Sequence, residues 1–336
     1  MSTALSLPVE LTEVLEASLV RHDLSGARLL FAVSGGSDSV GLLRAAKEWA
    51  RGAERQALVG HVNHGLRGGV CDADAAWVEA LCASVGLESE VVQVSLAVAS
   101  SEGAAREARY RALEGLADEH GCQAVVTAHT SDDQVDTVLH HVIRGAGMAG
   151  LSGMSELGRT PAGKVLVRPF LSVSREGIRK WLVERGQEWR EDASNADTGF
   201  TRNRIRHELL PLLERDFNPR VREALLRVSR LASDTMAATL STAEMLWEAS
   251  VVERSQSRVR VRCDVLGTVN EVQVREVLRW GWRQQRWPEQ AMGFDHWCRL
   301  AEVVGGERTA VDCPGGVTAR RQGGVMRLDR ETRSGD

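Results

Sequence analysis

A run of glycine and serine residues follows the first strongly apolar segment of the chain. The apolar segment is residues 29–33, and the residues directly after it are Ser34, Gly35, Gly36, Ser37, Asp38 and Ser39. A strand that turns through glycine into a helix lets backbone N–H groups approach an anion at the helix N-terminus, where the helix dipole also favours negative charge. The pattern predicts a loop that binds nucleotide phosphates, although an ordinary strand-to-helix turn would use the same residue types.

Asp38 sets this loop apart from the common phosphate-binding motif G-x-x-x-x-G-K-[ST], whose lysine is absent here. A carboxylate and a phosphate repel each other unless a metal ion bridges them. If the loop binds phosphate, Asp38 is therefore a candidate metal ligand.

A second polar group follows another apolar run, residues 124–128. Its members are His129, Asp132, Asp133 and Asp136. The apolar residues at helical spacing from 135 to 142 predict a helix over about 132–144 with a buried stripe. That stripe places Asp133 and Asp136 on a more exposed face and Asp132 nearer the buried edge.

Three carboxylates near one helix start repel each other, and the helix dipole offsets only part of the repulsion. A metal ion or an amine would relieve the rest. N-capping by Ser131 or Asp132 would account for one of the three acids. A further pair, Arg106 and Arg109, lies three residues apart on a predicted helix over about 104–120, where it would bind an anion or belong to a salt-bridged surface.

The elements that position these residues alternate between strand and helix in the first half of the chain. The expected strands are 29–33, 57–63, 90–94 and 123–128, and the expected helices are 39–49, 73–85, 104–120 and 132–144. Near-continuous apolar strands separated by helices indicate a doubly wound parallel sheet, which is the α/β fold class. In such sheets ligands bind at the carboxyl ends of the strands, where both polar groups fall.

Composition narrows the class of protein further. The chain has 336 residues, of which 43% are hydrophobic, and a formal net charge of −4, which excludes a globally basic protein. The six cysteines include no C-x-x-C pair, which disfavours a zinc site, an iron–sulfur centre or a disulfide framework. There is no run of about 18 uninterrupted apolar residues, and early glutamates do not fit a secretory signal. We expect a cytoplasmic protein with no membrane partner.

Taken together and in order, the motifs resemble those of the N-type ATP pyrophosphatases (PP-loop superfamily) and, within them, the tRNA(Ile)-lysidine synthetases. The resemblance covers roughly residues 25–217 and is specific because so many motifs occur in the family's order. It rests on 34–39, 61–67, 106–110, His129 with Asp132, Asp133 and Asp136, 144–145, 166–170, 191–195, 202–206 and 209–211.

The resemblance implies a ligase with ATP and Mg²⁺ as cofactors, and with free L-lysine and tRNA(Ile) carrying cytidine at the first anticodon position as partners. ATP would adenylate the cytosine carbonyl oxygen, and the lysine amine would then displace AMP. By this resemblance, the loop Ser34–Ser39 binds pyrophosphate, Asp38 is a Mg²⁺ ligand, and Arg109 neutralises phosphate charge. Arg106 is a second candidate for the role of Arg109.

The same resemblance places His129 and Asp132 in the catalytic set and implies that Asp133 and Asp136 bind the amine of the substrate lysine. The family usually has glutamate in place of Asp136, so a shorter side chain leaves open whether this residue meets lysine or metal. Arg202, Arg204 and Arg206 are expected to bind tRNA phosphates; a solvated helix face would carry the same charges.

We expect two domains, a catalytic domain over residues 1–217 and a mainly helical tRNA-substrate domain over 218–336. The second would contain helices over 221–252 and 270–285 and short strands over 309–328, with clustered tryptophans in its core. A homodimer is an option that the sequence leaves open. Two other functions compete: a tRNA thiolase of the same superfamily, which the lack of C-x-x-C disfavours, and an inactive tRNA-binding module, which the intact Asp38, His129 and Asp133 disfavour.

Overall fold

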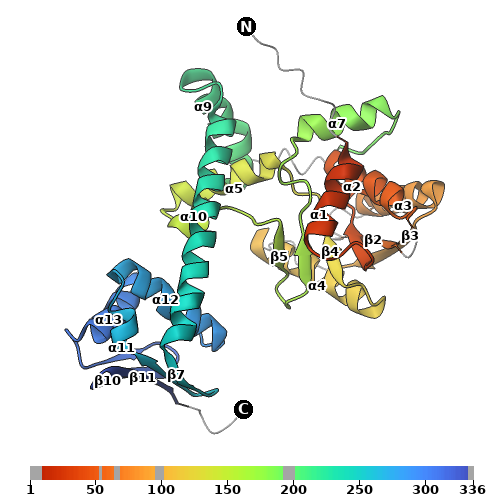
Figure 1. Cartoon of the computed structure of the whole chain (residues 1–336). Helices are drawn as coiled ribbons and strands as arrows, with labels where there is room; N and C mark the ends of the chain where they lie inside the picture. Colours follow the sequence, from red (N-terminus) through yellow and green to blue (C-terminus); the bar gives the residue numbers. More distant parts are fainter. Residues whose placement is uncertain (1–9, 53–54, 64–68, 95–101, 192–200, 332–336) are drawn as a thin grey trace. The chain divides into compact units, whose positions relative to one another are not determined.

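The computed structural model describes residues 10–52, 55–63, 69–94, 102–191 and 201–331 (Figure 1). The chain divides into two compact units, Met1–Arg230 (unit 1) and Leu231–Asp336 (unit 2). This division lies inside a long helix, whereas the sequence suggested a boundary at residues 217–218. In the described part of the chain, no helix is long and apolar enough to cross a membrane.

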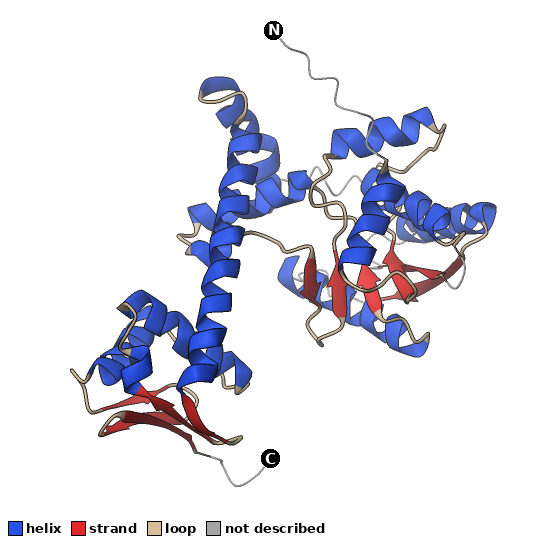
Figure 2. Cartoon of the chain, viewed as in Figure 1, coloured by secondary structure: helices blue, strands red, loops and turns tan. Residues whose placement is uncertain are grey.

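Unit 1 is built on a six-stranded sheet (Figure 2). In the order in which they pair, its strands are β3 (Glu88–Gln93), β2 (Gln56–Asn63), β1 (Arg28–Ala32), β4 (Ala124–Val126), β6 (Val165–Val167) and β5 (Leu157–Arg159). All neighbours run parallel except β5, which pairs antiparallel with β6. The predicted α/β class with a parallel sheet is confirmed.

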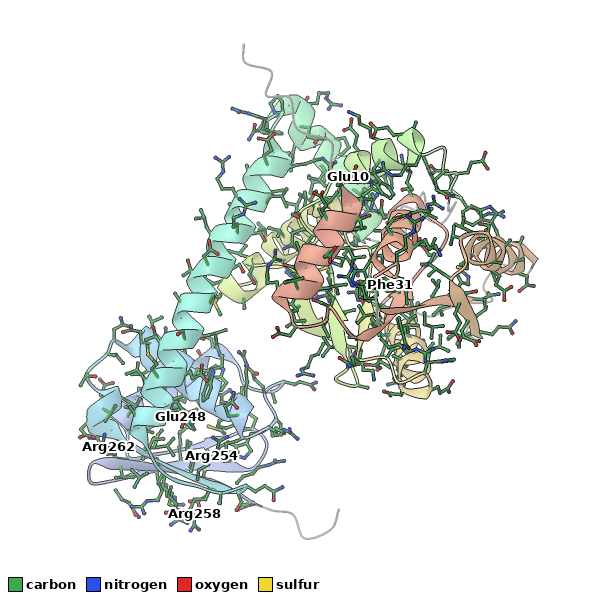
Figure 3. The ribbon with its side chains drawn as sticks, turned by 45° about the vertical axis from the view of Figure 1, so that its right-hand side comes forward. Glu10, Phe31, Glu248, Arg254, Arg258 and Arg262 are labelled. Atoms are coloured by element: carbon green, nitrogen blue, oxygen red, sulfur yellow. The ribbon has the colours of Figure 1, made fainter. Side chains whose placement is uncertain are left out.

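Helices cover both faces of this sheet because β1 alternates its apolar side chains between them. Leu29 and Phe31, the latter labelled in Figure 3, are fully buried against helices on one face. Leu30 is buried on the other face with α4. The first face carries α1 (Leu11–Arg21), α2 (Ser37–Trp49), α3 (Gly69–Val85) and α7 (Arg175–Glu184), and the second carries α4 (Glu102–Glu119).

The strand order places the two predicted polar groups side by side. The chain leaves β1 toward β2 on one side and returns to β4 on the other, so the order reverses between β1 and β4. A crevice forms at such a switch point, outside the carboxyl ends of the two strands. The loop after β1 enters α2 there, and the segment after β4 enters α5 (Ser131–Ile143).

A helical segment packs on α5. It consists of α8 (Thr201–Arg204), a π-helical turn η2 (Ile205–Leu209), α9 (Leu210–Asp216) and the start of α10 (Val221–Ser250). Ile205 and Leu210 form a small core with Val135 and Leu139 of α5, and residues at the start of α10 pack against it. The short helix α6 (Met148–Leu151) follows α5. This packing explains why the compact unit extends past the predicted boundary.

Unit 2 combines helices with a five-stranded antiparallel sheet in the order β7-β8-β11-β10-β9. Trp247, Trp282 and Trp297 are almost fully buried in its core, and Trp287 is also buried. Of the clustered tryptophans in the sequence, Trp282 and Trp287 therefore lie in the core as expected, whereas Trp280 packs against it and is only partly buried. The elements after α10 are β7 (Val251–Arg254), β8 (Arg258–Arg262), α11 (Cys263–Leu266), α12 (Glu271–Gln284), α13 (Phe294–Gly305), β9 (Ala310–Cys313), β10 (Val317–Gln322) and β11 (Val325–Arg330).

Candidate active site at the carboxyl edge of the parallel sheet

The loop between β1 and α2 has the geometry expected of an anion cradle. Gly35 has φ +95°, a conformation that L side chains rarely adopt, and Gly36 is the N-cap of α2 without a side-chain capping bond. The Ser39 hydroxyl accepts hydrogen bonds from the backbone N–H groups of Ser34 and Gly35, both at 3.1 Å, and donates to the Gly36 carbonyl at 2.9 Å. Ser39 therefore fixes the loop, and the N–H groups of the first turn of α2 have no side-chain cap.

Helix α5 begins with a reciprocal cap made by Thr130 and Asp133. The Asp133 N–H donates to Thr130 Oγ1 at 3.4 Å, and the Thr130 N–H donates to Asp133 Oδ2 at 3.0 Å. The alternative of capping by Ser131 or Asp132 is excluded because the helix starts at Ser131, one residue earlier than predicted, which makes Thr130 its N-cap.

The exposure predicted for the α5 acids was also wrong. Asp136 is fully buried, and the Asp132 side chain is 25% exposed against 14% for Asp133. The physical reason is that η2, which packs on the predicted apolar stripe at Val135 and Leu139, extends Arg206 over Asp133 and Asp136. Asp136 is thus an interior carboxylate, and its Oδ1 is buried without a hydrogen-bond partner among the described residues.

Arginines from distant elements pair with Asp133 and Asp136. The Arg206 guanidinium, on η2, donates through Nη2 to Asp133 Oδ1 at 2.7 Å and through Nε to Asp136 Oδ2 at 2.8 Å. Arg202 Nη2 lies 3.9 Å from Asp133 Oδ1. The cation that three clustered aspartates require is therefore supplied, in this structure, by the chain itself.

Arg175, the first residue of α7, joins the two polar groups. Its Nε donates to Asp38 Oδ2 at 2.8 Å, its Nη2 lies 3.4 Å from Asp133 Oδ1, and its backbone N–H donates to Asp132 Oδ2 at 2.9 Å. Asp132 also pairs with Arg222 Nη1 at 3.2 Å. We refer to the three acids at the start of α5, Asp132, Asp133 and Asp136, as the carboxylate cluster, which Arg175 connects to Asp38 of the loop.

The surroundings set the pKa values of the acids of α5 and of Asp38. Burial would raise the pKa of Asp133, but Arg175, the Thr130 N–H and neighbouring cations lower it to about 2. Burial raises the pKa of Asp38 above its usual value despite Arg175, and it raises the pKa of Asp136 despite Arg206. Of Asp38, Asp133 and Asp136, Asp133 is therefore the one whose ionised form is most stabilised at neutral pH.

His129 lies beside a group of arginines at the end of β4. Its Nδ1 is 2.8 Å from Thr127 Oγ1, and burial together with the charges of Arg109, Arg106 and Arg168 lowers its pKa to about 3, against the opposing effect of Asp133. His129 is therefore neutral at physiological pH. Both Arg106 and Arg109 place their guanidinium groups within 5.3 Å of the Tyr110 ring centroid. The Nε of Arg109 is buried without a partner in the described structure.

The three arginines expected at tRNA separate into two environments. Arg202 and Arg206 face Asp133, with side chains 25% and 18% exposed. Arg204 is 64% exposed and pairs with Glu208 at 3.4 Å. Within this set, only Arg204 is mainly directed to solvent.

Comparison with known proteins identifies the family. Residues 9–213 match the family described as the PP-loop domain. The tRNA(Ile)-lysidine synthase of Rhodopirellula baltica is 33% identical over 326 residues, which span 84% of this chain and 81% of that protein. The enzyme of the same name from Streptomyces coelicolor is 38% identical over 303 residues, spanning 89% and 84%. The chain belongs to the tRNA(Ile)-lysidine synthase family.

A solved structure supports the fold of this family member. The U34-tRNA thiolase NcsA from Methanococcus maripaludis superposes with a TM-score of 0.54 and 17% identity, covering 66% of this chain and 78% of that one. At this identity the likeness concerns the fold alone. The cysteines with described side chains, Cys82, Cys122, Cys263, Cys298 and Cys313, are free.

Parts of two motifs of the lysidine synthase resemblance lie outside the described residues, namely 64–67 of the motif 61–67 and 192–195 of the motif 191–195. Sequence reasoning missed Arg175 and Arg222, which complete the carboxylate cluster. Arg175 follows Ser174, whose hydroxyl caps α7 by accepting the Gly177 N–H. A serine cap was the only local signal near Arg175, and it marks a helix start rather than a site.

Proposed function

We propose that this member of the tRNA(Ile)-lysidine synthase family joins lysine to the cytidine at the first anticodon position of tRNA(Ile), using ATP. The observation that carries the proposal is the match to lysidine synthases over more than four fifths of both chains. The site is consistent with this chemistry because a phosphate-type loop and the carboxylate cluster meet at one sheet edge, bridged by Arg175.

The first step we propose is adenylation of the base. The cytosine carbonyl oxygen attacks the α-phosphorus of ATP, and pyrophosphate leaves with the electron pair of the broken P–O bond. The uncapped N–H groups at the start of α2 and the dipole of that helix are placed to bind the leaving group. Arg109 and Arg106 add positive charge near His129.

Mg²⁺ is a proposed cofactor, and Asp38 is the residue that we propose holds it. Among the described residues no three or more histidine, cysteine, aspartate or glutamate side chains gather to form a protein-only metal site. That agrees with Mg²⁺, which usually takes one or two carboxylates and completes its shell with water and substrate phosphates. Burial raises the pKa of Asp38 even with Arg175 bound, so a further cation beside this carboxylate would be favourable. When bound, Mg²⁺ would neutralise phosphate charge.

The second step we propose is attack of the lysine ε-amine on the activated carbon, with loss of AMP. Lysine reaches the site as an ammonium ion and must lose a proton before it attacks. Asp133, with a pKa of about 2, suits binding of the ammonium. Asp136, whose pKa is raised by burial and whose Oδ1 has no partner among the described residues, suits acceptance of that proton. Lysine would share both carboxylates with Arg206.

His129 has a more limited role in this proposal. A pKa of about 3 makes its imidazole a weak base at neutral pH. We assign it hydrogen bonding as a neutral ring near the adenylation site, held by Thr127. Asp132 is assigned to positioning because it receives the Arg175 backbone N–H and the Arg222 guanidinium.

A direct assay tests the proposal. The protein is incubated with ATP, MgCl₂, labelled L-lysine and a tRNA(Ile) transcript, beside a transcript with uridine at the first anticodon position. We expect label in the cytidine transcript alone, with one AMP and one pyrophosphate released per lysine, and no AMP when EDTA replaces MgCl₂. Absence of lysine transfer by folded protein would contradict the proposal. Sedimentation velocity of the same sample checks whether a homodimer forms.

A further inference from the structure

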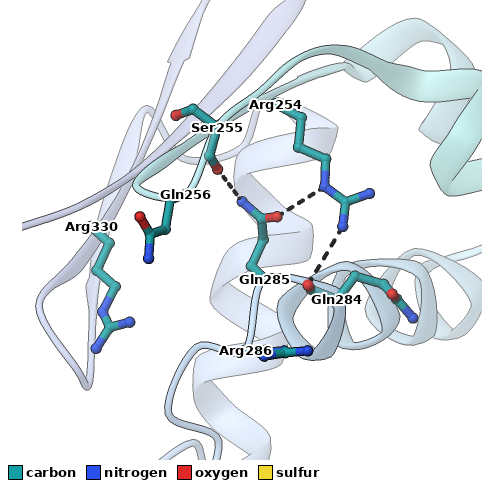
Figure 4. Close-up of a pocket in the computed structure, with 7 residues that line it drawn as sticks. All are labelled: Arg254, Ser255, Gln256, Gln284, Gln285, Arg286 and Arg330. Carbon is teal, nitrogen blue, oxygen red and sulfur yellow. Dashed lines mark hydrogen bonds between the residues drawn. The ribbon is translucent and has the colours of Figure 1, made fainter.

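A hollow of about 390 Å³ in unit 2 is lined by residues that have no role in the candidate active site. It is formed where the end of β7, the end of α12 and the end of β11 meet (Figure 4). The described residues that line it include three arginines and no carboxylate. The residues are Arg254, Ser255, Gln256, Gln284, Gln285, Arg286 and Arg330.

The charge of these arginines is not balanced as it is elsewhere in unit 2. On neighbouring positions Arg258 pairs with Asp329 at 2.8 Å, Arg260 with Glu253 at 3.1 Å and Arg283 with Glu289 at 2.9 Å. The lining arginines form no ion pair within the part of the chain that the structure describes. The hollow is therefore locally positive although the whole chain has a formal net charge of −4.

Hydrogen bonds hold part of the lining in place before any ligand binds. The Gln285 side chain donates to the Ser255 carbonyl at 2.7 Å and accepts from Arg254 Nε at 3.0 Å (Figure 4). Arg254 Nη2 also donates to the Gln284 carbonyl at 3.5 Å. The Arg254 guanidinium is thus oriented, which reduces the entropy lost when it binds an anion.

The backbone conformation of Arg286 is a second sign that an arginine is needed at the hollow. Arg286 follows the C-cap Gln285 and has φ +52°, the left-handed conformation in which helices ordinarily place glycine. A β-carbon there carries a conformational cost. The chain keeps an exposed arginine at this point in spite of that cost, on the rim of the hollow.

We propose that this hollow binds a backbone phosphate of the tRNA. Guanidinium groups bind phosphate oxygens through paired, charge-assisted hydrogen bonds, and the glutamine amides can add neutral ones. None of the described residues that line the hollow is aromatic, so they offer no surface on which a base could stack. The site therefore recognises the phosphodiester and not the base. That the phosphate belongs to tRNA rests on the proposed function.

The test compares Arg286→Ala, Arg330→Ala and the double variant with Arg260→Ala, an ion-paired arginine of the same sheet, as the matched control. Dissociation constants for tRNA(Ile) are measured by fluorescence anisotropy from 50 to 300 mM NaCl, and circular dichroism checks folding. We expect each single variant to weaken binding about tenfold and the double variant to lower the slope of log Kd against log salt by about 1. The control should match the wild-type protein.

A second tRNA transcript distinguishes recognition of a base from contact with a phosphate. Because the site would read no base, the loss should be equal for the transcripts with cytidine and with uridine at the first anticodon position. In the lysine assay, the double variant should raise KM for tRNA while kcat at saturating tRNA stays within about twofold, the pattern of lost uniform binding. A loss confined to one transcript would overturn the proposal.

Two further outcomes decide between sources of phosphate and separate this proposal from the proposed function. If inorganic phosphate or AMP shifts Arg286 and Arg330 signals by NMR while the double variant binds tRNA like the wild type, the site belongs to a free anion and the proposal fails. If the wild type transfers no lysine but the double variant loses tRNA affinity and salt slope, the phosphate site stands and the proposed function fails.

Discussion

The phosphate-type loop Ser34–Ser39 and the carboxylate cluster lie at the same sheet edge but are built in opposite ways. The loop is held mainly by its own residues, through the Ser39 hydroxyl and the backbone conformation of Gly35, with one bond from a distant residue, the Arg190 N–H to the Gly35 carbonyl. The cluster is held by arginines far away in sequence, such as Arg206, which lies 73 residues from Asp133. One half of the site is a local structure, and the other is a tertiary one.

This difference has a consequence for function. The loop presents partial charges of a helix terminus, which are fixed whether or not a ligand is present. The cluster presents full charges whose balance depends on which cations are near. Ligand binding should therefore change the ionic contacts of Arg175 and Arg206 much more than the conformation of the loop.

The largest expected effect is that substitutions in the two halves of the site slow different steps of the reaction. Asn in place of Asp133 keeps the shape and can keep the Thr130 cap but removes the negative charge. We expect lysine transfer to fall about 100-fold while formation of the adenylated tRNA falls much less. The reason is that the Asp133 carboxylate is proposed to bind the lysine ammonium, which takes part only in the second step. Asp38→Asn is the matched variant in the loop and should abolish adenylation. Rapid-quench separation of adenylated tRNA from lysidine product measures both steps, and equal losses of both in Asp133→Asn would remove the lysine role.

The next effect tests the bridge between the halves. Arg175→Ala leaves Asp38 and Asp133 without their shared cation, so we expect a loss of about 2 kcal/mol in the free energy of unfolding, measured by urea denaturation. Arg175→Lys should recover part of it. The control is Arg185→Ala, which removes a surface pair with Glu10 near the end of the same helix and should cost less than about 1 kcal/mol. Equal losses in the two alanine variants would show that Arg175 is not a bridge.

The local half of the site was predictable from sequence. The run Ser34–Ser39 follows the apolar segment 29–33, and both the turn and the start of the helix depend on residues within that run. The parallel sheet and the helices α2, α4 and α5 were also predictable, because the period of the apolar residues reports the type of element and which of its faces is buried.

The tertiary half was not predictable. The sequence placed Asp133 and Asp136 together on one exposed face, and the pattern on α5 contains no sign of the η2 segment that buries Asp136. It indicated that the aspartates need a cation but named a metal or an amine, since nothing in the spacing of Arg175 or Arg206 connects them to α5. Ion pairing between distant elements is a property of the fold.

A smaller effect concerns His129 and the free energy of unfolding at acid pH. The pKa of His129 is lowered to about 3 in the folded protein, and its ordinary value is 6.5. Between these values the unfolded chain binds a proton that the folded one does not, so the free energy of unfolding falls as the pH falls from 6.5. Its contribution is at most about 1.4 kcal/mol per pH unit. His129→Gln should flatten the pH dependence between 4.5 and 6.5, a window above the range in which Asp133 titrates. An unchanged slope would contradict burial of a neutral imidazole.

The smallest effect probes the loop backbone alone. Gly35→Ala places a β-carbon at φ +95°, whereas the nearest atoms, on Val78 and Trp77, are at ordinary contact distances of 3.5 Å or more. The cost therefore comes from conformation and should be about 1 kcal/mol in the free energy of unfolding. Gly115→Ala is the control, because that glycine lies inside α4 without a left-handed φ and no atom is within 4 Å of the added β-carbon, so the substitution should stabilise the protein by up to about 1 kcal/mol. Thermal and urea denaturation of both variants measure the difference. If Gly35→Ala costs no more than the control, the left-handed conformation of Gly35 does not hold the loop, and its hydrogen bonds with Ser39 and Arg190 must shape it.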